Sequence, residues 1–426
     1  MKVNLNVDVH HLTRVEGHGN IHVRVADGKL QEASWEVIET PRYFEAILRG
    51  KHYSTAGILT SRICGICSIG HCLASVRATE DAFGLKIPEA AAKLRMLAKH
   101  GETLASHALH LFFLAAPDFV GLESAIPLIE LKPEVVGIAA KLKGLGNRLC
   151  DVVVGRTTHP VSIQVGGIAV LPDKKKLAAI RQELEAAVPD LHATADLFHT
   201  FKIPAFARET EFVSLKGEKN YPWIGGRLLS TDKVDKPEAD YLAMTNEFLP
   251  PKGTTKYTKL SRHSFAVGAL ARFNNNYEFL VPLAKTVAES FGLKPVCHNP
   301  YMHNVAQLVE TVHVVVETLG MIDEILGWPE STPIMAKVAP KAGRGVGAVE
   351  VPRGILYHDY TYDGEGRVVK ANCIIPTTQN HNNIQDDMVA LVEQFAKEPG
   401  MSDKQLELLC SMLVRAYDPC ISCSVH

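Results

Sequence analysis

Two Cys-x-x-Cys motifs lie near opposite ends of the chain. Cys64 and Cys67 form the first motif, Cys420 and Cys423 form the second, and His426 is the final residue. Chain ends usually fray at the surface, so a tail rich in potential metal ligands is unusual. Because thiolates and imidazoles bind soft and borderline metals, the sequence predicts one buried four-thiolate metal site supplied by both ends of the chain.

The separation of the motifs bears on the kind of metal site. Zinc ribbons place their cysteine pairs about 15–20 residues apart, whereas Cys67 and Cys420 are 353 positions apart (420 minus 67). A structural staple can form locally with little loop-closure entropy. A site that needs the whole fold is more typical of one where protein shape controls chemistry. The spacing therefore favours a catalytic metal, with structural zinc and a redox dithiol as alternatives.

The composition bounds the class of protein. The chain has 426 residues, 46% of them hydrophobic, and a net charge of −2, which gives no footprint for nucleic acid or a membrane surface. Nine cysteines at scattered spacings indicate cytosolic thiols and metal ligands, not a disulfide framework. Residues 1–10 show no secretory signal, and no apolar run of membrane-spanning length is evident. We therefore expect a cytoplasmic protein.

Helical and strand patterns together predict an α+β fold that is mainly helical, with a long central helix bundle and peripheral β layers. Residues 1–40 alternate as strands around the hairpin turn Asp27-Gly28, residues 203–262 are irregular and strand-like, and Asp363-Gly364 marks another hairpin. The expected helices are 42–48, one beginning near 71, 88–116 closed by Pro117-Asp118, 133–155, 173–200, 275–292, 303–327, 383–397 and 403–416.

The position of the metal site also bears on domain organisation. Length alone would suggest two or three domains. Because neither half could form the shared metal site, we expect a single domain over residues 1–426. The helix 303–327 is apolar almost all round, so we expect it at the centre of the bundle.

The residues around the cysteines carry a family resemblance. Arg62-x-Cys64-Gly65-x-Cys67-x-x-x-His71 and Asp418-Pro419-Cys420-x-x-Cys423-x-x-His426 resemble the paired signatures of the nickel–iron hydrogenase large subunit. Further segments fall in the expected order: Arg14 to His18, Glu45, Gly155 to Pro160, Gly268 to Arg272, Val351 to Gly354 and Pro376 to Thr378. No glycine follows Arg42, and Gln379 replaces a tryptophan of the periplasmic enzymes, which resembles the cytoplasmic, multimeric, reversible branch.

The resemblance implies the ligands of a nickel–iron centre. Cys64 and Cys420 would be terminal ligands of nickel, while Cys67 and Cys423 would bridge nickel to a low-spin iron that carries CO and two cyanides. Thiolates suit nickel. Ligands supplied by protein are too weak-field to keep iron low-spin, so the diatomic ligands would be added during assembly.

A second, hard cation is also implied, either Mg²⁺ or Fe²⁺. Glu45, His426 and the backbone carbonyl near Cys373 resemble its ligands. Such an ion would hold the carboxyl-terminal tail over the site, which would explain why the chain ends on a metal-binding residue.

The resemblance also assigns a proton route. H2 is a very weak acid, so its cleavage needs both a metal and a base that accepts the proton. Cys420 would be the first proton acceptor and Glu16 the next carboxylate along the exit route. The alternative for Glu16 is a structural ion pair with Arg14.

Other residues would act on the open face of the metals. Arg353 would polarise H2 or act as a base and hydrogen-bond a cyanide, with Pro352 beside it in the cofactor pocket. Its alternative is a loop arginine anchored to carboxylates. Asp118 and Asp418 could hold Arg353 in place, although Asp418 could equally be a plain turn residue.

Two further contacts with the cofactor are implied. Thr377 and the backbone at Pro376 would donate hydrogen bonds to the other cyanide. His71, one helical turn after Cys67, should hydrogen-bond a ligand sulfur, and its alternative is a core histidine whose bonds are satisfied elsewhere.

Electrons must leave such a site through a partner, because both Cys-x-x-Cys motifs are committed to it. The expected partner is a small subunit with iron–sulfur clusters, followed by further flavin or iron–sulfur subunits and a soluble carrier such as NAD(P) or ferredoxin. Two rival functions share the fold. One is a hydrogen sensor with the same site, and the other is the metal-free scaffold subunit of respiratory complex I, whose members have lost the four cysteines.

Overall fold

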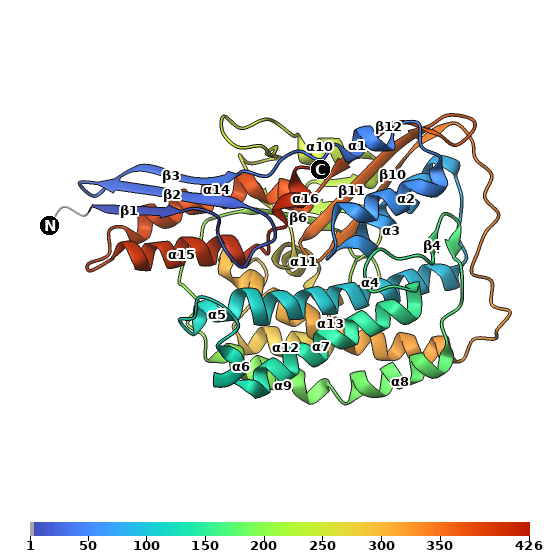
Figure 1. Cartoon of the computed structure of the whole chain (residues 1–426), viewed down its shortest axis with the longest axis horizontal. Helices are drawn as coiled ribbons and strands as arrows, with labels where there is room; N and C mark the ends of the chain where they lie inside the picture. Colours follow the sequence, from blue (N-terminus) through green and yellow to red (C-terminus); the bar gives the residue numbers. More distant parts are fainter. Residues whose placement is uncertain (1–3) are drawn as a thin grey trace.

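Helices alone form one layer of the molecule, and small sheets together with further helices form the other (Figure 1). The computed structural model describes residues 4–426. Residues 1–3 lie outside the described residues. They belong to the predicted amino-terminal strands, to the segment predicted to carry no secretory signal and to the predicted single domain. The helices are α1 (Phe44–Leu48), α2 (Tyr53–Thr60), α3 (Ser68–Phe83), α4 (Glu89–Leu109), α5 (Ala116–Phe119), α6 (Leu128–Leu131), α7 (Pro133–Val154), α8 (Lys174–Glu185), α9 (Val188–His199), α10 (Tyr241–Thr245), α11 (Ala269–Asn276), α12 (Pro282–Ser290), α13 (His303–Leu326), α14 (Pro376–Phe395), α15 (Asp403–Ala416) and α16 (Ile421–Ser424).

The strands form small, mostly antiparallel sheets. The strands are β1 (Leu5–Val9), β2 (Gly19–Ala26), β3 (Lys29–Val37), β4 (Ile163–Gln164), β5 (Gly167–Ile168), β6 (Glu211–Leu215), β7 (Arg227–Ser230), β8 (Asp235–Pro237), β9 (Phe265–Ala266), β10 (Gly343–Val351), β11 (Gly354–Tyr362) and β12 (Val368–Ile374). Their orders are β1-β2-β3, β10-β11-β12, β4-β5 and β8-β7-β6-β9, with β6 and β9 parallel. The predicted α+β, mainly helical fold is confirmed.

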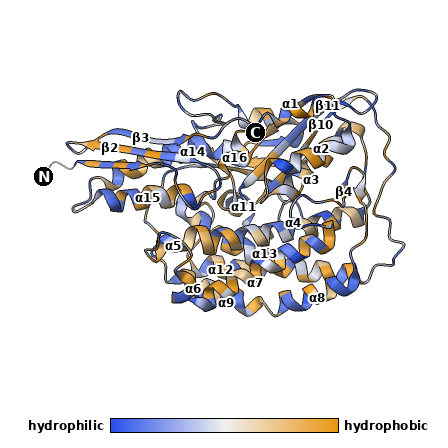
Figure 2. Cartoon of the chain, viewed as in Figure 1, coloured by the Kyte–Doolittle hydropathy of each residue, from blue (hydrophilic) through white to orange (hydrophobic). Residues whose placement is uncertain are grey.

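The alternation of apolar and polar residues explains the amino-terminal sheet. In Figure 2, hydrophobic and hydrophilic residues alternate along its strands. Ile21 pairs with Trp35 across β2 and β3, and both side chains are buried on one face. Asp27 and Gly28 adopt positive φ angles in the connecting turn, as the predicted hairpin requires.

Helix α13 lies in the core of the helical layer, where it packs against α4, α8 and α12. With its preceding turn, Pro300–Leu326, it is long and apolar enough to cross a membrane, contrary to the expectation that no such run exists. Inside the protein, however, 72% of its most apolar window is buried. It is therefore the core helix that the pattern of residues 303–327 predicts.

Several predicted helix boundaries are wrong. Pro117-Asp118 does not close the helix, because a π-helical stretch, His110–Ala115, leads into α5, where the proline occupies the first turn and needs no N–H partner. The predicted helices 173–200 and 275–292 are each interrupted, and the second pieces carry Pro189 and Pro282 in their first turns. Helix α14 begins at Pro376, seven positions before the predicted start (383 minus 376).

The tight crossing of α4 and α7 gives a stability prediction. A Cβ on Gly146 would lie 2.6 Å from both the Ala105 nitrogen and the Gly101 oxygen. We expect Gly146→Ala to lower the free energy of unfolding by about 1–3 kcal/mol, as overpacking of a core does. Gly137→Ala on the same helix meets nothing within 4 Å, so it should have no such cost. Equal midpoints of denaturant unfolding for the two variants would contradict the prediction.

Candidate metal centre

The cysteines of the two motifs meet in the interior, and all four are buried. The sulfurs of Cys64 and Cys420 are 3.5 Å apart, and Cys64, Cys67 and Cys423 place their sulfurs within 4.8 Å of one another. Cys420 and Cys423 form a disulfide in this structure. Both must therefore be reduced before the set can act as the four thiolates that the sequence predicts.

Local structure aims the first pair at the site. Cys64 has an extended backbone after a short turn, and its sulfur accepts the N–H groups of Ile66 and Cys67, each at 3.3 Å. Cys67 lies at the amino-terminal end of α3, where the helix dipole favours a thiolate. The hydrogen bond from Cys67 and the charge of Arg353 lower the pKa of Cys64, whereas the same bond and burial raise the pKa of Cys67.

The carboxyl-terminal pair is held by the loop that contains Glu16. The Ile421 N–H donates to the Glu16 carbonyl at 2.8 Å, and the two segments run parallel at Glu16 and Cys420. Gly17 has φ 86°, and a Cβ there would lie 2.8 Å from the Ser422 nitrogen. Only glycine fits this close approach without strain. The tail is thus placed by the other end of the chain.

The Glu16 carboxylate lies directly beside a ligand sulfur. One of its oxygens is 3.1 Å from the Cys420 sulfur and 3.1 Å from the Ser422 nitrogen. Its other oxygen accepts the Ser422 hydroxyl. The alternative role for Glu16, an ion pair with Arg14, is not what the structure shows, because Arg14 pairs with Asp118.

Arg353 is buried and held by only one of the two predicted carboxylates. Its Nη2 donates to Asp418 at 2.8 Å. Burial acts to lower the pKa of Arg353, but the charges of Asp418, Cys64, Cys67 and Glu16 together outweigh it and raise that pKa. The predicted contact with Asp118 is wrong, because Asp118 binds Arg415 at 2.9 and 3.0 Å in addition to Arg14. Those two arginines saturate Asp118 elsewhere.

The predicted cofactor contacts of Thr377, Pro376 and Pro352 differ in outcome. The Thr377 hydroxyl accepts the Cys420 N–H at 3.0 Å, which leaves its own hydrogen free to donate. Pro376 begins α14 and has no N–H, so the predicted backbone donation from it is wrong. The Pro352 carbonyl accepts from Arg272 at 3.1 Å.

His71 does not make its predicted bond to sulfur. Its Nδ1 is 3.2 Å from Nε2 of His358, and among the described residues its Nε2 has no partner. Burial, followed by the charge of His358, lowers the pKa of His71 well below its usual value. His71 is therefore neutral near pH 7.

The three groups predicted to bind a hard cation do come together. His426 Nε2 is 2.6 Å from the Cys373 carbonyl oxygen and 3.7 Å from Oε1 of Glu45. That same Oε1 accepts the Cys373 N–H at 2.8 Å. Burial acts to raise the pKa of Glu45, but the hydrogen bond and charge of His426 lower it overall. An ionised carboxylate, a carbonyl oxygen and an imidazole suit a divalent cation.

Two side chains that hold the site were not predicted from the sequence. The Nη2 of Arg42 donates to the Ile63 carbonyl at 2.8 Å and to the Ser422 carbonyl at 2.6 Å, so it joins the segments of both cysteine motifs. Gln307 donates to Asp418 at 3.2 Å from α13. The sequence shows that no glycine follows Arg42, but no sequence pattern predicts the contacts of Arg42 or of Gln307.

The donor set fits a nickel–iron centre. Four converging sulfurs are the ligands that nickel and iron favour. Among the described residues, Nε and Nη1 of Arg353 are buried without partners, so they remain free for a group bound at the sulfurs. A buried, thiolate-rich site with a carboxylate at one sulfur defines the class of protein as a metalloenzyme.

Comparison with known proteins agrees. The family model for nickel-dependent hydrogenase matches residues 42–132 and 256–426. Sulfhydrogenase 1 subunit alpha of Pyrococcus furiosus is 33% identical over 429 residues, covering 99% of this chain and 98% of the relative. NAD-reducing hydrogenase HoxS subunit beta of Cupriavidus necator is 28% identical, covering 97% and 93%. A crystal structure of NAD+-reducing nickel–iron hydrogenase superposes with a TM-score of 0.90 at 26% identity, covering 99% of both chains.

The chain belongs to the nickel-dependent hydrogenase family. It is a catalytic subunit of a nickel–iron hydrogenase, which confirms the resemblance noted in the sequence. The relatives are named as subunits of larger enzymes.

Proposed function

We propose that this subunit cleaves H2 reversibly into protons and electrons, with Cys64, Cys67, Cys420 and Cys423 holding the nickel–iron centre. The observation that carries the proposal is the Glu16 oxygen 3.1 Å from the Cys420 sulfur, inside a cluster built from both chain ends. The bound centre would supply the place where H2 is split and its electrons are taken up. The rival function, a metal-free scaffold subunit, does not require four cysteines that converge on one site.

The chain's own residues then move the proton. The Cys420 thiolate accepts it and passes it to Glu16 across 3.1 Å, which is within hydrogen-bond reach. The Ser422 hydroxyl, which donates to the other oxygen of Glu16, steadies that carboxylate. Cys420 and Glu16 would thus be successive proton acceptors on one transfer path.

Arg353 would orient the diatomic ligands and substrate. Two of its nitrogens, Nε and Nη1, are buried without a partner among the described residues, and the charges of Cys64 and Cys67 act on its guanidinium. We assign one of these nitrogens to a cyanide and place the guanidinium over the open face of the metals. Thr377, with its free hydroxyl hydrogen, would donate to the other cyanide.

Electrons would leave through a small subunit with iron–sulfur clusters. Gly65, inside the first cysteine motif, is exposed, so the metal-binding loop reaches the surface. Arg62, three positions before Gly65, lines a cavity of about 470 Å³ together with Arg156, His159 and mostly apolar residues. The two arginines are exposed and have no ion-pair partner among the described residues. This face is therefore suited to an acidic partner close to the metals.

The final carrier would be reached through further flavin or iron–sulfur subunits. Both the HoxS relative and the superposed structure are named as NAD-reducing, which favours NAD(P) as the carrier here. A cytoplasmic location and a single domain over residues 1–426 remain predictions.

Glu45, His426 and the Cys373 carbonyl would bind Mg²⁺ or Fe²⁺. We expect His426→Ala, which removes one ligand, to release about one such ion per chain. Turnover should fall about 10- to 100-fold, because the ion supports the nickel–iron site from outside its ligand shell. Elemental analysis and dye-linked H2 oxidation would measure both. His263→Ala is the control, since that histidine is 72% exposed and pairs only with Asp386. Unchanged cation content in His426→Ala would contradict the assignment.

The deciding experiment combines infrared spectroscopy with turnover. The purified complex should show CO and cyanide stretching bands, about one nickel per chain, and H2-dependent dye reduction. Zinc alone, without nickel, would contradict the proposal. The infrared bands with very slow turnover would instead indicate a hydrogen sensor.

A further inference from the structure

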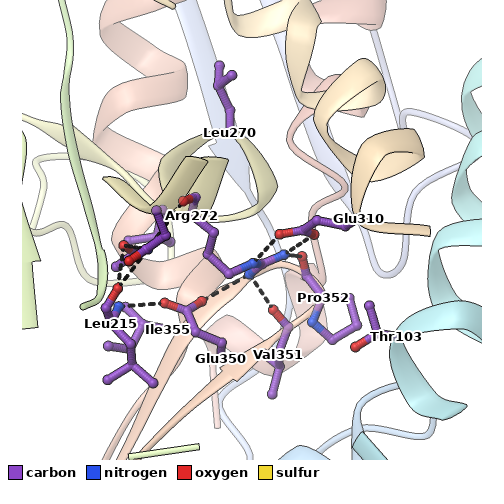
Figure 3. Close-up of polar contacts among 12 residues, drawn as sticks. Thr103, Leu215, Leu270, Arg272, Glu310, Glu350, Val351, Pro352 and Ile355 are labelled. Atoms are coloured by element: carbon purple, nitrogen blue, oxygen red, sulfur yellow. Dashed lines mark hydrogen bonds and ion pairs between the residues drawn. The ribbon is translucent and has the colours of Figure 1, made fainter. Parts of the chain in front are cut away.

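Arg272 on α11 is fully buried, and each of its five N–H donors has an acceptor (Figure 3). The Nε and Nη2 atoms donate to the two oxygens of Glu310, both at 2.6 Å. Nη1 donates to Glu350 at 2.9 Å and to the Val351 carbonyl at 2.9 Å, while Nη2 also donates to the Pro352 carbonyl at 3.1 Å.

The two carbonyls bound by Arg272 immediately precede Arg353. Val351 ends β10 and Gly354 begins β11, so Arg353 lies in the tight turn that joins the two strands. Within the described residues, the guanidinium of Arg353 has one partner, Asp418. Its direction is therefore set by Asp418 at the tip and by the anchored backbone at the base.

Helix α13 supports both ends of Arg353. Gln307 donates to Asp418 at 3.2 Å, and Glu310, three positions later (310 minus 307), binds Arg272. Residues at this spacing lie on the same face of a helix. One rigid helix thus fixes the distance between the anchor of the Arg353 backbone and the partner of its side chain.

We propose that Arg272, held by Glu310 and Glu350, is a positioning residue that sets the direction of Arg353 toward the metals. The inference rests on the proposed function, because it assumes that Arg353 acts on the open face of the metal centre. A lysine could neutralise one carboxylate, but its compact ammonium group cannot span two carboxylates and two successive carbonyls.

The test substitutes Arg272→Lys in the whole hydrogenase complex. We expect turnover to fall about tenfold or more with nickel retained, and the CO and cyanide bands to shift in the same direction as in Arg353→Lys. A role through Arg353 also predicts non-additivity: the double variant should lose no more turnover than Arg353→Lys alone. Independent, additive losses would mean that Arg272 does not act through Arg353.

Arg95→Lys is a matched control. Arg95 is also buried, pairs with both oxygens of Glu80 and donates to the carbonyls of Gln164 and Gly167, far along the chain from Arg353. It should lower stability without shifting the infrared bands. A band shift of equal size in Arg95→Lys would overturn the proposal.

Glu350→Gln is the second variant, in case Arg272→Lys does not load nickel. It keeps the side-chain volume and the oxygen that accepts the Leu215 N–H at 2.8 Å, but removes an acceptor of Arg272. A several-fold loss of turnover with the same band shift is expected. Unchanged bands and turnover in a nickel-loaded variant would overturn the proposal, as would loss of nickel in both variants, which would indicate a role in assembly. If Arg353→Lys itself keeps full turnover and unshifted bands, the proposed function of Arg353 fails instead.

Discussion

Cys420→Ser is expected to lose nickel and with it all hydrogenase turnover, a decrease of more than about 10⁴-fold. The Cys420 sulfur is 3.5 Å from that of Cys64 and 3.1 Å from Glu16, so it belongs both to the metal site and to the proton route. A serine hydroxyl is not deprotonated near neutral pH and is a poor ligand for nickel. Elemental analysis and dye-linked H2 oxidation would measure the two losses.

Cys297→Ser is the control for this variant. Cys297 is only partly buried and belongs to none of the metal-binding groups in the described part of the chain. The same substitution there should leave nickel content and turnover near those of the unsubstituted enzyme. Nickel retained in Cys420→Ser would show that the four-cysteine assignment is wrong.

Glu16→Gln should lower turnover by about 10²–10⁴-fold, the usual range for a positioned acid–base group. Glutamine keeps the shape, and its single oxygen can still accept the Ser422 N–H while its NH2 group faces the Ser422 hydroxyl, but it cannot take up a proton from Cys420. Nickel content and infrared bands should therefore stay close to those of the unsubstituted enzyme. The solvent isotope effect on H2 oxidation should rise, because proton transfer would become rate-limiting.

Two further variants sharpen this result. Glu16→Asp retains a carboxylate that is one methylene shorter, so it should recover part of the lost turnover. Glu32→Gln makes the same change on β3, where the carboxylate pairs with Lys252 at the surface, and should have no effect. Full turnover in Glu16→Gln would reduce Glu16 to a structural support for the tail.

The helix boundaries show where sequence patterns stop being informative. The hairpin at Asp27-Gly28 and the core helix 303–327 were predicted because their signals, a two-residue turn and an apolar surface all round, are local. The breaks before Pro189 and Pro282 were missed because a proline in the first turn of a new helix leaves the apolar spacing almost unchanged. Pro117 was predicted to end a helix, but it occupies the first turn of α5, where a proline is tolerated and the chain stays helical.

The sequence by itself determined the chemistry of the site. Two Cys-x-x-Cys motifs specify a soft ligand set and Glu45 with His426 a hard one, whatever the path of the chain, and Glu16 adds a proton acceptor. Only the tertiary structure decided which groups meet. Asp118 and Asp418 are chemically identical, yet Arg14 and Arg415 occupy the first while Arg353 binds the second. Such pairings depend on distances between segments remote in sequence, and no local pattern encodes those distances.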